Sequence, residues 1–191
     1  MRAVVDNFVD DFEGLRAHCD SLNYEGAVNP IDGVLYPGIS LDIPESVVVE
    51  IAGKLSKAVG LDLTGHLMFI RMTDSDTVPP HHAHNDAVMG DYGMLLYLNR
   101  SEHCTGGTSF VRHIATGMDG NPKDLEQEAI WKRDTNTDEA WEVLEMVEMK
   151  PNRALIFDTR DMHRAEPVTG FGNSAENGRL VLTCFARAAY G

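Results

Sequence analysis

Residues 81–86 read HHAHND, so three histidines and an aspartate lie within six positions. Side chains two positions apart point to the same side of an extended segment, which would bring His84 and Asp86 together. An imidazole and a carboxylate both bind divalent metal ions, but the ion still needs a third ligand. His163 is a distant candidate, because it follows the apolar segment RALIFD and precedes Pro167, which predicts a place at the end of a strand beside a loop. Two histidines and one carboxylate on one face of an ion are the ligand set of non-haem Fe(II) sites, which keep positions open for substrate and oxygen.

Other interpretations of the same segment remain open. The chain has eight histidines, so a His-x-Asp pattern also arises by chance in a polar surface turn. His82 alternates with His84 and Asp86, so all three could face one side. A second possible ligand set, of the kind that cupin metal enzymes use, is therefore His82, His84 and His163, with or without Asp86. His81 and His82 are otherwise expected to lie beside the ligands or in a lid that meets the substrate.

Two amphipathic segments near the N-terminus predict helices that would support such a site. Residues 10–24 begin with Asp10 or Asp11 as a cap, and residues 44–60 end with Gly60, which suits a helix C-terminus. Residues 29–40 contain proline and glycine and are expected to form a loop. The apolar faces of the two helices comprise Phe12, Leu15, Cys19 and Leu22, and Val48, Ile51, Leu55 and Val59.

From residue 65 onward the chain consists of short β-rich segments separated by turns. A polar segment at 121–141 interrupts them and is expected to be partly helical. Helices followed by many strands indicate an α+β protein in which the helices pack on a β-sandwich or barrel. We expect a single domain of residues 1–191, with a support region at 1–64 and a β core at 65–191. The expected strands are residues 66–73, 92–99, 107–113, 142–149, 153–159 and 179–188.

The composition narrows the classes of function. A formal net charge of −14 repels phosphate backbones, so nucleic acids are not expected partners, whereas solubility and cationic substrates are favoured. Three widely spaced cysteines without a C-x-x-C pair indicate a reducing compartment and argue against disulfides and a zinc knuckle. Acidic residues near the start replace the apolar core of a signal peptide, and no apolar run approaches a membrane span in length. We therefore expect a cytoplasmic protein without a membrane partner.

Further short motifs follow the His-x-Asp pattern in order along the chain. They are YLN at 97–99, GG at 106–107, the apolar-Phe pair of RALIFD at 156–157, His163-x-x-x-Pro167, and Arg179 near the start of the last strand. This order resembles the Fe(II)- and 2-oxoglutarate-dependent dioxygenases, and among them the prolyl-hydroxylase-like branch. The resemblance covers about residues 65–190, and VVDNF, LR and YPG before it are similar to a group of small members of that superfamily. It implies a double-stranded β-helix, a jelly-roll or cupin-like core with N-terminal helices packed on it.

The resemblance also implies a reaction. His84, Asp86 and His163 would hold Fe(II), with 2-oxoglutarate and O2 at the remaining positions and ascorbate as a supporting reductant. A C–H bond of an amino acid, a protein side chain or a small metabolite would be hydroxylated, with release of succinate and CO2. Halogenating relatives have a small residue in place of the aspartate, so Asp86 favours hydroxylation, or a dealkylation that follows from it.

The far carboxylate of 2-oxoglutarate has its own matching residues. Arg179 corresponds to the family's cation and Tyr97 to its tyrosine, while Thr183 shares the strand face of Arg179. Arg187 is eight residues further along, about 26 Å away at about 3.3 Å per residue, and is expected to lie at the surface. Related enzymes often have a tyrosine where this chain has Met72, so that hydrogen bond is expected to be missing or supplied elsewhere.

The remaining candidates are less closely tied to the resemblance. Arg160 lies near His163 in sequence and is expected to help orient it, Trp131 to stack on a substrate or a partner, and His113 to be structural. Two other functions stay open: a cupin-type metal enzyme that needs no 2-oxoglutarate, and a non-catalytic jelly-roll binding module. The sequence leaves the oligomeric state open.

Overall fold

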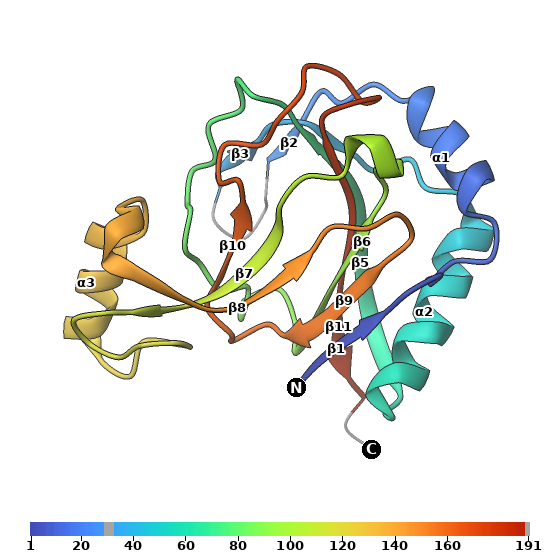
Figure 1. Ribbon diagram of the computed structural model, residues 1–191. Coiled ribbons are helices and arrows are strands. Elements are labelled where there is room, and N and C mark those ends of the chain that lie inside the picture. The colour runs from blue at the N-terminus through green and yellow to red at the C-terminus, as the bar shows by residue number, and fades with distance from the viewer. Residues whose placement is uncertain (29–32, 190–191) are drawn as a thin grey trace.

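Two antiparallel sheets face each other in the computed structural model, which describes residues 1–28 and 33–189 (Figure 1). The predicted α+β class is confirmed. The larger sheet has the order β1 (Arg2–Val5), β9 (Ala154–Asp158), β6 (Tyr92–Tyr97), β11 (Arg179–Ala188), β5 (Leu63–Thr73) and β4 (Ile39–Ser40). The smaller sheet comprises β10 (His163–Glu166), β7 (Gly107–His113) and β8 (Trp141–Glu148), and β2 (Ala27–Val28) pairs with β3 (Leu35–Tyr36).

Strand alternation gives the larger sheet two different faces. On β11, Leu180 and Leu182 belong to the core under the helices, whereas Val181 and Thr183 face the smaller sheet. The side chains of neighbouring residues in a strand point to opposite faces, so each strand supplies apolar residues to the helical side and site residues to the other. The side chains between the two sheets form a second apolar core that includes Tyr97, Phe110, Val147, Leu155, Phe157 and Val181.

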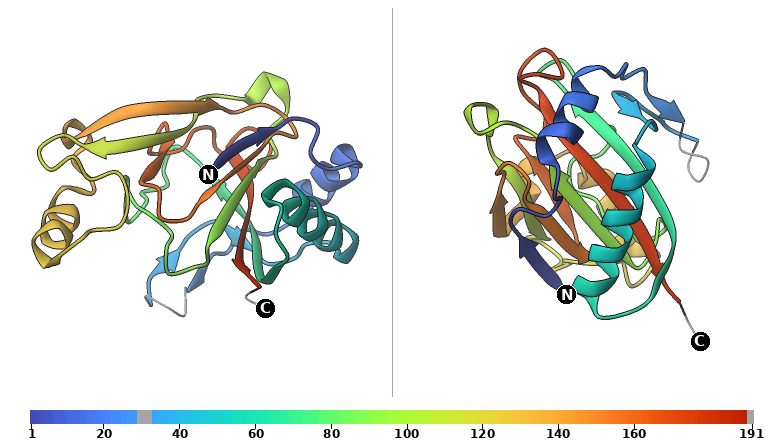
Figure 2. Two further views of the ribbon diagram at one scale, coloured as in Figure 1. Left: turned by 90° about the horizontal axis from the view of Figure 1, so that it is seen from below. Right: turned by 90° about the vertical axis from the view of Figure 1, so that its right-hand side faces the viewer.

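The helices α1 (Phe12–Asp20) and α2 (Glu45–Val59) cover the outer face of the larger sheet (Figures 1 and 2). Asp11 caps α1 by accepting a hydrogen bond from the Gly14 N–H at 2.9 Å, and Gly60 ends α2 in the left-handed conformation at φ 76°. Both predicted helices are confirmed, although α1 ends at Asp20 and leaves Leu22 outside it.

The structure also tests the expectations for the polar segment at 121–141, the loop at 29–40 and the absence of a membrane span. The polar segment contains the predicted helix, α3 (Leu125–Asp134), which lies beyond the end of β7 and β8 and away from α1 and α2 (Figure 1). The expected loop at 29–40 is wrong for β3 and β4, while residues 29–32 lie outside the described part. Among the helices that the structure describes, none combines the length and apolar character needed to cross a membrane.

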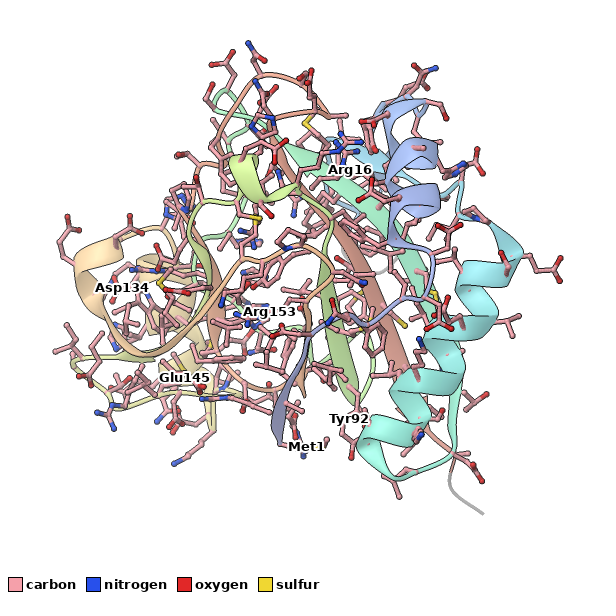
Figure 3. All side chains as sticks on the ribbon, turned by 45° about the vertical axis from the view of Figure 1, so that its right-hand side comes forward. Met1, Arg16, Tyr92, Asp134, Glu145 and Arg153 are labelled. Atoms are coloured by element: carbon pink, nitrogen blue, oxygen red, sulfur yellow. The ribbon has the colours of Figure 1, made fainter. Side chains whose placement is uncertain are left out.

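Arg16 of α1 is the largest fully buried side chain of the described residues and points into the body of the protein (Figure 3). Its Nη2 donates a hydrogen bond to the carbonyl oxygen of Ala175 at 2.8 Å, and its Nη1 lies 2.8 Å from Asp20 Oδ1. Ala175 belongs to the connection that leads into β11. The buried guanidinium therefore ties α1 to the segment immediately before Arg179.

We expect Arg16→Ala to lower the free energy of unfolding by about 2 kcal/mol, because a buried, charge-assisted hydrogen bond is lost and its carbonyl partner is left unpaired. Urea denaturation measures this change. Arg100→Ala is the matched control, since Arg100 reaches the same Asp20 at 3.5 Å from a more exposed position. It should cost less than about 0.5 kcal/mol, and equal losses in the two variants would contradict the anchoring role of Arg16.

Candidate metal centre

Three side chains meet at one end of the space between the sheets. His84, Asp86 and His163 each offer one ligand atom, and these atoms lie within 4.8 Å of one another. Asp86 Oδ2 is 3.3 Å from His163 Nε2, and Asp86 Oδ1 is 4.0 Å from His84 Nε2. The structure thus brings together the three residues expected from the sequence, close enough to share one divalent ion.

Backbone pairing fixes these residues relative to one another. The His84 N–H donates to the His163 carbonyl oxygen at 3.0 Å, and the His163 N–H donates to the His84 carbonyl oxygen at 2.8 Å. The Asp86 N–H donates to the Thr159 carbonyl oxygen at 2.8 Å. The His-x-Asp segment is therefore held as a short antiparallel partner of the chain around His163. His163 lies at a strand end beside a loop, as expected, and it is the first residue of a separate strand, β10.

The imidazole rings are oriented through their second nitrogen atoms. His84 Nδ1 lies 2.9 Å from the His82 carbonyl oxygen, and His163 Nδ1 lies 2.9 Å from the Asp161 carbonyl oxygen. A carbonyl can only accept, so each Nδ1 carries the proton and each Nε2 is left to bind the ion. Backbone carbonyls therefore orient the two rings, a role that was expected of Arg160 at His163. The exposed guanidinium of Arg160 pairs with Asp158 instead.

The charges of the three groups suit a divalent cation. Burial lowers the pKa of His84 to about 4, so this ring is neutral at ordinary pH. Burial is the largest influence on Asp86 and opposes its ionisation, but the hydrogen bond and charge of His163 and the charges of His84 and Arg71 together outweigh it and lower the pKa of the carboxyl. Burial would likewise lower the pKa of His163, but its hydrogen bond to Asp86 and the carboxylate charge raise it.

A cavity of about 880 Å³ opens beside the three ligands. Alternating residues of the larger sheet line it, among them Phe69 and Arg71 of β5 and Arg179 and Thr183 of β11. The smaller sheet contributes Thr108 and His163. The metal ligands therefore face a chamber between the two sheets that has room for more than one small molecule.

Arg179 lies inside this chamber, where its side chain has free hydrogen-bonding capacity. It is 5% exposed, and Nη2 donates to Thr108 Oγ1 at 3.3 Å, while Nη1 is buried and has no hydrogen-bond partner among the described residues. The guanidinium lies 5.7 Å from the ring of Tyr97, whose hydroxyl donates to Thr108 Oγ1 at 2.9 Å. A buried guanidinium with an unpaired donor fits a ligand carboxylate. The structure brings Arg179, Tyr97 and Thr183 to the cavity region as expected, with the Tyr97 hydroxyl engaged by Thr108.

Several other candidates lie where they cannot bind the ion. The His82 ring points to Asp138, with Nδ1 2.9 Å from Oδ1, so the alternative ligand set that includes His82 is not assembled. His81 is exposed at the cavity rim, and Trp131 lies in the cavity wall, where its Nε1 donates to the Ala83 carbonyl oxygen at 3.0 Å. His113 is structural, as its nitrogens contact Thr116 and Asp134. Arg187 is exposed and does not line the cavity.

Sequence reasoning missed two cavity residues. Thr108 follows the glycine pair, and its oxygen accepts from both Tyr97 and Arg179, so its own proton is free to be donated into the chamber. Arg71 faces the chamber from β5, whereas Met72 packs on the helical side. Strand alternation around the FIRMT segment could have identified Arg71, because neighbours in a strand face opposite ways.

Comparisons with known proteins agree with this architecture. A family model described as "Family of unknown function (DUF6445)" matches residues 2–186. No curated protein sequence matches the chain. A prolyl-4-hydroxylase from Pseudomonas putida is similar in structure, with a TM-score of 0.53 and 16% identity over 99% of this chain and 93% of the other.

Two further solved structures have the same fold. The non-haem alpha-ketoglutarate-dependent carbocyclase SnoK from nogalamycin biosynthesis has a TM-score of 0.62 and 16% identity over 97% of this chain and 78% of its own. EvdO2 from Micromonospora carbonacea var. aurantiaca, complexed with 2-oxoglutarate, has a TM-score of 0.55 and 16% identity over 98% and 86%. The expected double-stranded β-helix with helices packed on it is therefore confirmed, as is the resemblance to Fe(II)/2-oxoglutarate dioxygenases at the level of fold.

We expect the protein to bind one divalent ion, such as Mn(II), and His163→Ala to abolish this binding because one of three ligands is lost. Calorimetric titration of the metal measures both. His82→Ala is the matched control and should bind the metal as the wild type does, since its ring is turned to Asp138. Loss of binding in the control, or its retention in His163→Ala, would show that the ion lies elsewhere.

We expect metal affinity to fall as the pH falls, because the ion must displace the proton whose binding Asp86 favours at His163. The raised pKa of His163 places this loss at pH values below that pKa, where the affinity should drop about tenfold per pH unit. His84, with its pKa of about 4, should add nothing above about pH 5. Calorimetry in buffers of different ionisation enthalpy counts the released protons, and release of two protons near neutral pH would contradict the neutral state of His84.

Proposed function

The chain belongs to the DUF6445 family, and we propose that it is an Fe(II)- and 2-oxoglutarate-dependent dioxygenase that hydroxylates a C–H bond of an amino acid, a peptidyl side chain or a small metabolite. The observation that carries the proposal is that the His84–Asp86–His163 cluster and the buried Arg179 open onto one cavity. The fold, shared with 2-oxoglutarate-dependent enzymes, supports it.

The donor set fits Fe(II). His84 and His163 would hold the ion through two imidazoles and Asp86 through its carboxylate, a ligand set that leaves positions for further ligands, and the cavity lies beside them. When bound, Fe(II) with 2-oxoglutarate and O2 supplies the oxidising chemistry, with release of succinate and CO2, and ascorbate would support it by keeping the iron reduced. The chain's part is to hold the three ligands rigidly, which the backbone bonds between His84 and His163 achieve. Asp86 would supply a carboxylate ligand where halogenating relatives have a small residue, which favours hydroxylation.

Arg179 fits the far carboxylate of 2-oxoglutarate. Burial lowers its pKa, but the ordinary value for arginine is so high that the group stays charged at physiological pH. Burial raises the pKa of Tyr97, so its hydroxyl stays protonated and keeps its bond to Thr108. Arg179 would bind the carboxylate through Nη1, with the Thr108 and Thr183 hydroxyls beside it. The sheets on both sides would exclude water from this pair and strengthen it.

A cupin-type enzyme that needs no 2-oxoglutarate is the less favoured alternative. Such a site would use His82 as a ligand, but its ring is bound to Asp138. It would also leave the unpaired Nη1 of Arg179 unexplained.

The three cysteines, which the structure shows as free thiols, agree with the proposed cytoplasmic location.

We expect the Fe(II)-loaded protein to convert 2-oxoglutarate slowly to succinate even without substrate, and Arg179→Met to raise the dissociation constant for 2-oxoglutarate about tenfold or more. Succinate release and calorimetry on the Mn(II)-loaded protein measure these effects. Arg187→Met is the matched control on the same strand and should change neither. The proposal fails if the metal-loaded wild type neither binds 2-oxoglutarate nor forms succinate, or if Arg187→Met has the effect assigned to Arg179→Met.

A further inference from the structure

Arg71 is a second cation that lines the cavity, partly buried as a residue, and the function proposed for Arg179 does not use it. Its Nε and Nη2 are buried and have no hydrogen-bond partner among the described residues. The ring centre of Tyr36 of β3 lies 5.7 Å from the guanidinium carbon. Burying an arginine without a partner costs free energy, so an unpaired guanidinium that faces a cavity indicates a missing anion.

Arg71 and Arg179 line the chamber from two neighbouring strands of the larger sheet. Arg179 is on β11 and reaches across to Thr108 of the smaller sheet. Arg71 is on β5, opposite Val181 on one side and Ile39 of the edge strand β4 on the other. Arg71 is thus one strand nearer this edge than Arg179, which is its diagonal neighbour across β5 and β11.

Arg71 also lies within electrostatic range of the metal ligands. Burial lowers its pKa, Tyr36 and Asp86 act in the opposite direction, and the like charge of Arg179 lowers it further. A group bound to Nε and Nη2 of Arg71 would thus be held near the ion, while Nη1 of Arg179 stays available to the far carboxylate of 2-oxoglutarate. This is the position that a substrate needs if one of its C–H bonds is to meet the reactive centre.

The charges of the cavity indicate what such a group would be. The charged residues that line it are Arg71, Arg179, Asp86 and Glu128, and Glu128 is paired with Lys132 at 2.5 Å. A divalent ion on Asp86 carries one net positive charge, and the two arginines raise the total to three. The two carboxylates of 2-oxoglutarate neutralise all but one of these. One negative charge on the substrate would therefore bring the net charge of the occupied site to zero.

The walls near Arg71 are largely apolar. Leu67 and Phe69 lie on the same face of β5, Phe185 lies opposite on β11, and Leu41 follows β4. These side chains offer no hydrogen-bonding groups, so they favour an uncharged, apolar body next to the anion.

We propose that Arg71 binds a carboxylate of the substrate, so that the substrate is a monoanionic carboxylate with an apolar body. The inference rests on the dioxygenase function proposed above and narrows its substrate class. The carboxylate belongs either to a free small acid or to the C-terminus of a peptide, and both present the same fork of two oxygens to the guanidinium. An overall net charge of −14 disfavours anions at the surface, which makes a buried cation the natural place to select one.

A binding experiment tests this assignment directly. The Mn(II)-loaded protein, with and without saturating 2-oxoglutarate, is titrated by calorimetry with straight-chain monocarboxylates from butanoate to decanoate and with their primary amides. Gly-Gly-Leu with a free or an amidated C-terminus forms the peptide arm. We expect at least one acid or the free peptide to bind, its amide not to bind, and Arg71→Met to weaken the acid about tenfold or more.

The same variant must leave 2-oxoglutarate binding within about threefold of the wild type, a margin below the tenfold loss of one charge-assisted bond. The assignment is overturned if no acid binds the wild type, if acids bind Arg71→Met equally well, or if the variant loses 2-oxoglutarate instead. Failure of the dioxygenase proposal is a separate result. It would show as absent 2-oxoglutarate binding in the wild type, while the titration with Mn(II) alone still tests Arg71.

A stability measurement separates this role from a structural one. A charge whose buried nitrogen atoms have no partner does not stabilise the fold, so the unfolding temperature of metal-free Arg71→Met should equal or exceed that of the wild type. Arg153→Met is the contrasting variant, because Arg153 (Figure 3) binds Asp6 through Nε at 2.6 Å and through Nη2 at 3.0 Å. It should lower the unfolding temperature. A loss in Arg71→Met as large as that in Arg153→Met would overturn the assignment.

Discussion

Two reciprocal backbone hydrogen bonds between His84 and His163 are the constraint on which the site depends. They join the loop that carries the His-x-Asp pattern to the start of β10, so residues far apart in the sequence present their side chains to one point. The carbonyl groups of His82 and Asp161 then take the Nδ1 protons and leave both Nε2 atoms facing Asp86. Backbone groups are fixed by the fold, so this arrangement needs no help from mobile charged side chains. The ligands are thereby organised before an ion binds, which reduces the entropy lost on binding.

The charge of the cavity is opposite to that of the protein as a whole. The chain has a formal net charge of −14, yet the buried Arg179 and the partly buried Arg71 both have buried nitrogen atoms without a hydrogen-bond partner among the described residues. Such groups destabilise a folded protein unless a ligand satisfies them. Tight apolar packing by the helices on the other face of the larger sheet, where Ile51 and Leu55 are fully buried, offsets this cost. On β5 and β11, the face that packs on the helices thus contributes to stability, and the opposite face lines the functional cavity.

Local patterns in the sequence were enough for much of this structure. The caps at Asp11 and Gly60 and the strand alternation gave the helices and most strands, and the ordered motifs gave the β-helix core and the cluster of His84, Asp86 and His163. The direction of His82 could not be predicted, because alternation fails where the chain leaves extended geometry and Asp138 attracts the ring. Arg160 is near His163 in sequence but pairs with its neighbour Asp158, a contact that sequence distance does not reveal.

The central claim is that one ion and one dicarboxylate share the chamber between the sheets. A crystal structure of the protein with Mn(II) and 2-oxoglutarate, with the manganese located by its anomalous scattering, tests it most directly. The account predicts the ion on Nε2 of His84, Nε2 of His163 and the carboxylate of Asp86, with the far carboxylate of the dicarboxylate on Arg179. An ion bound elsewhere, or a dicarboxylate that leaves Arg179 unpaired, would contradict it.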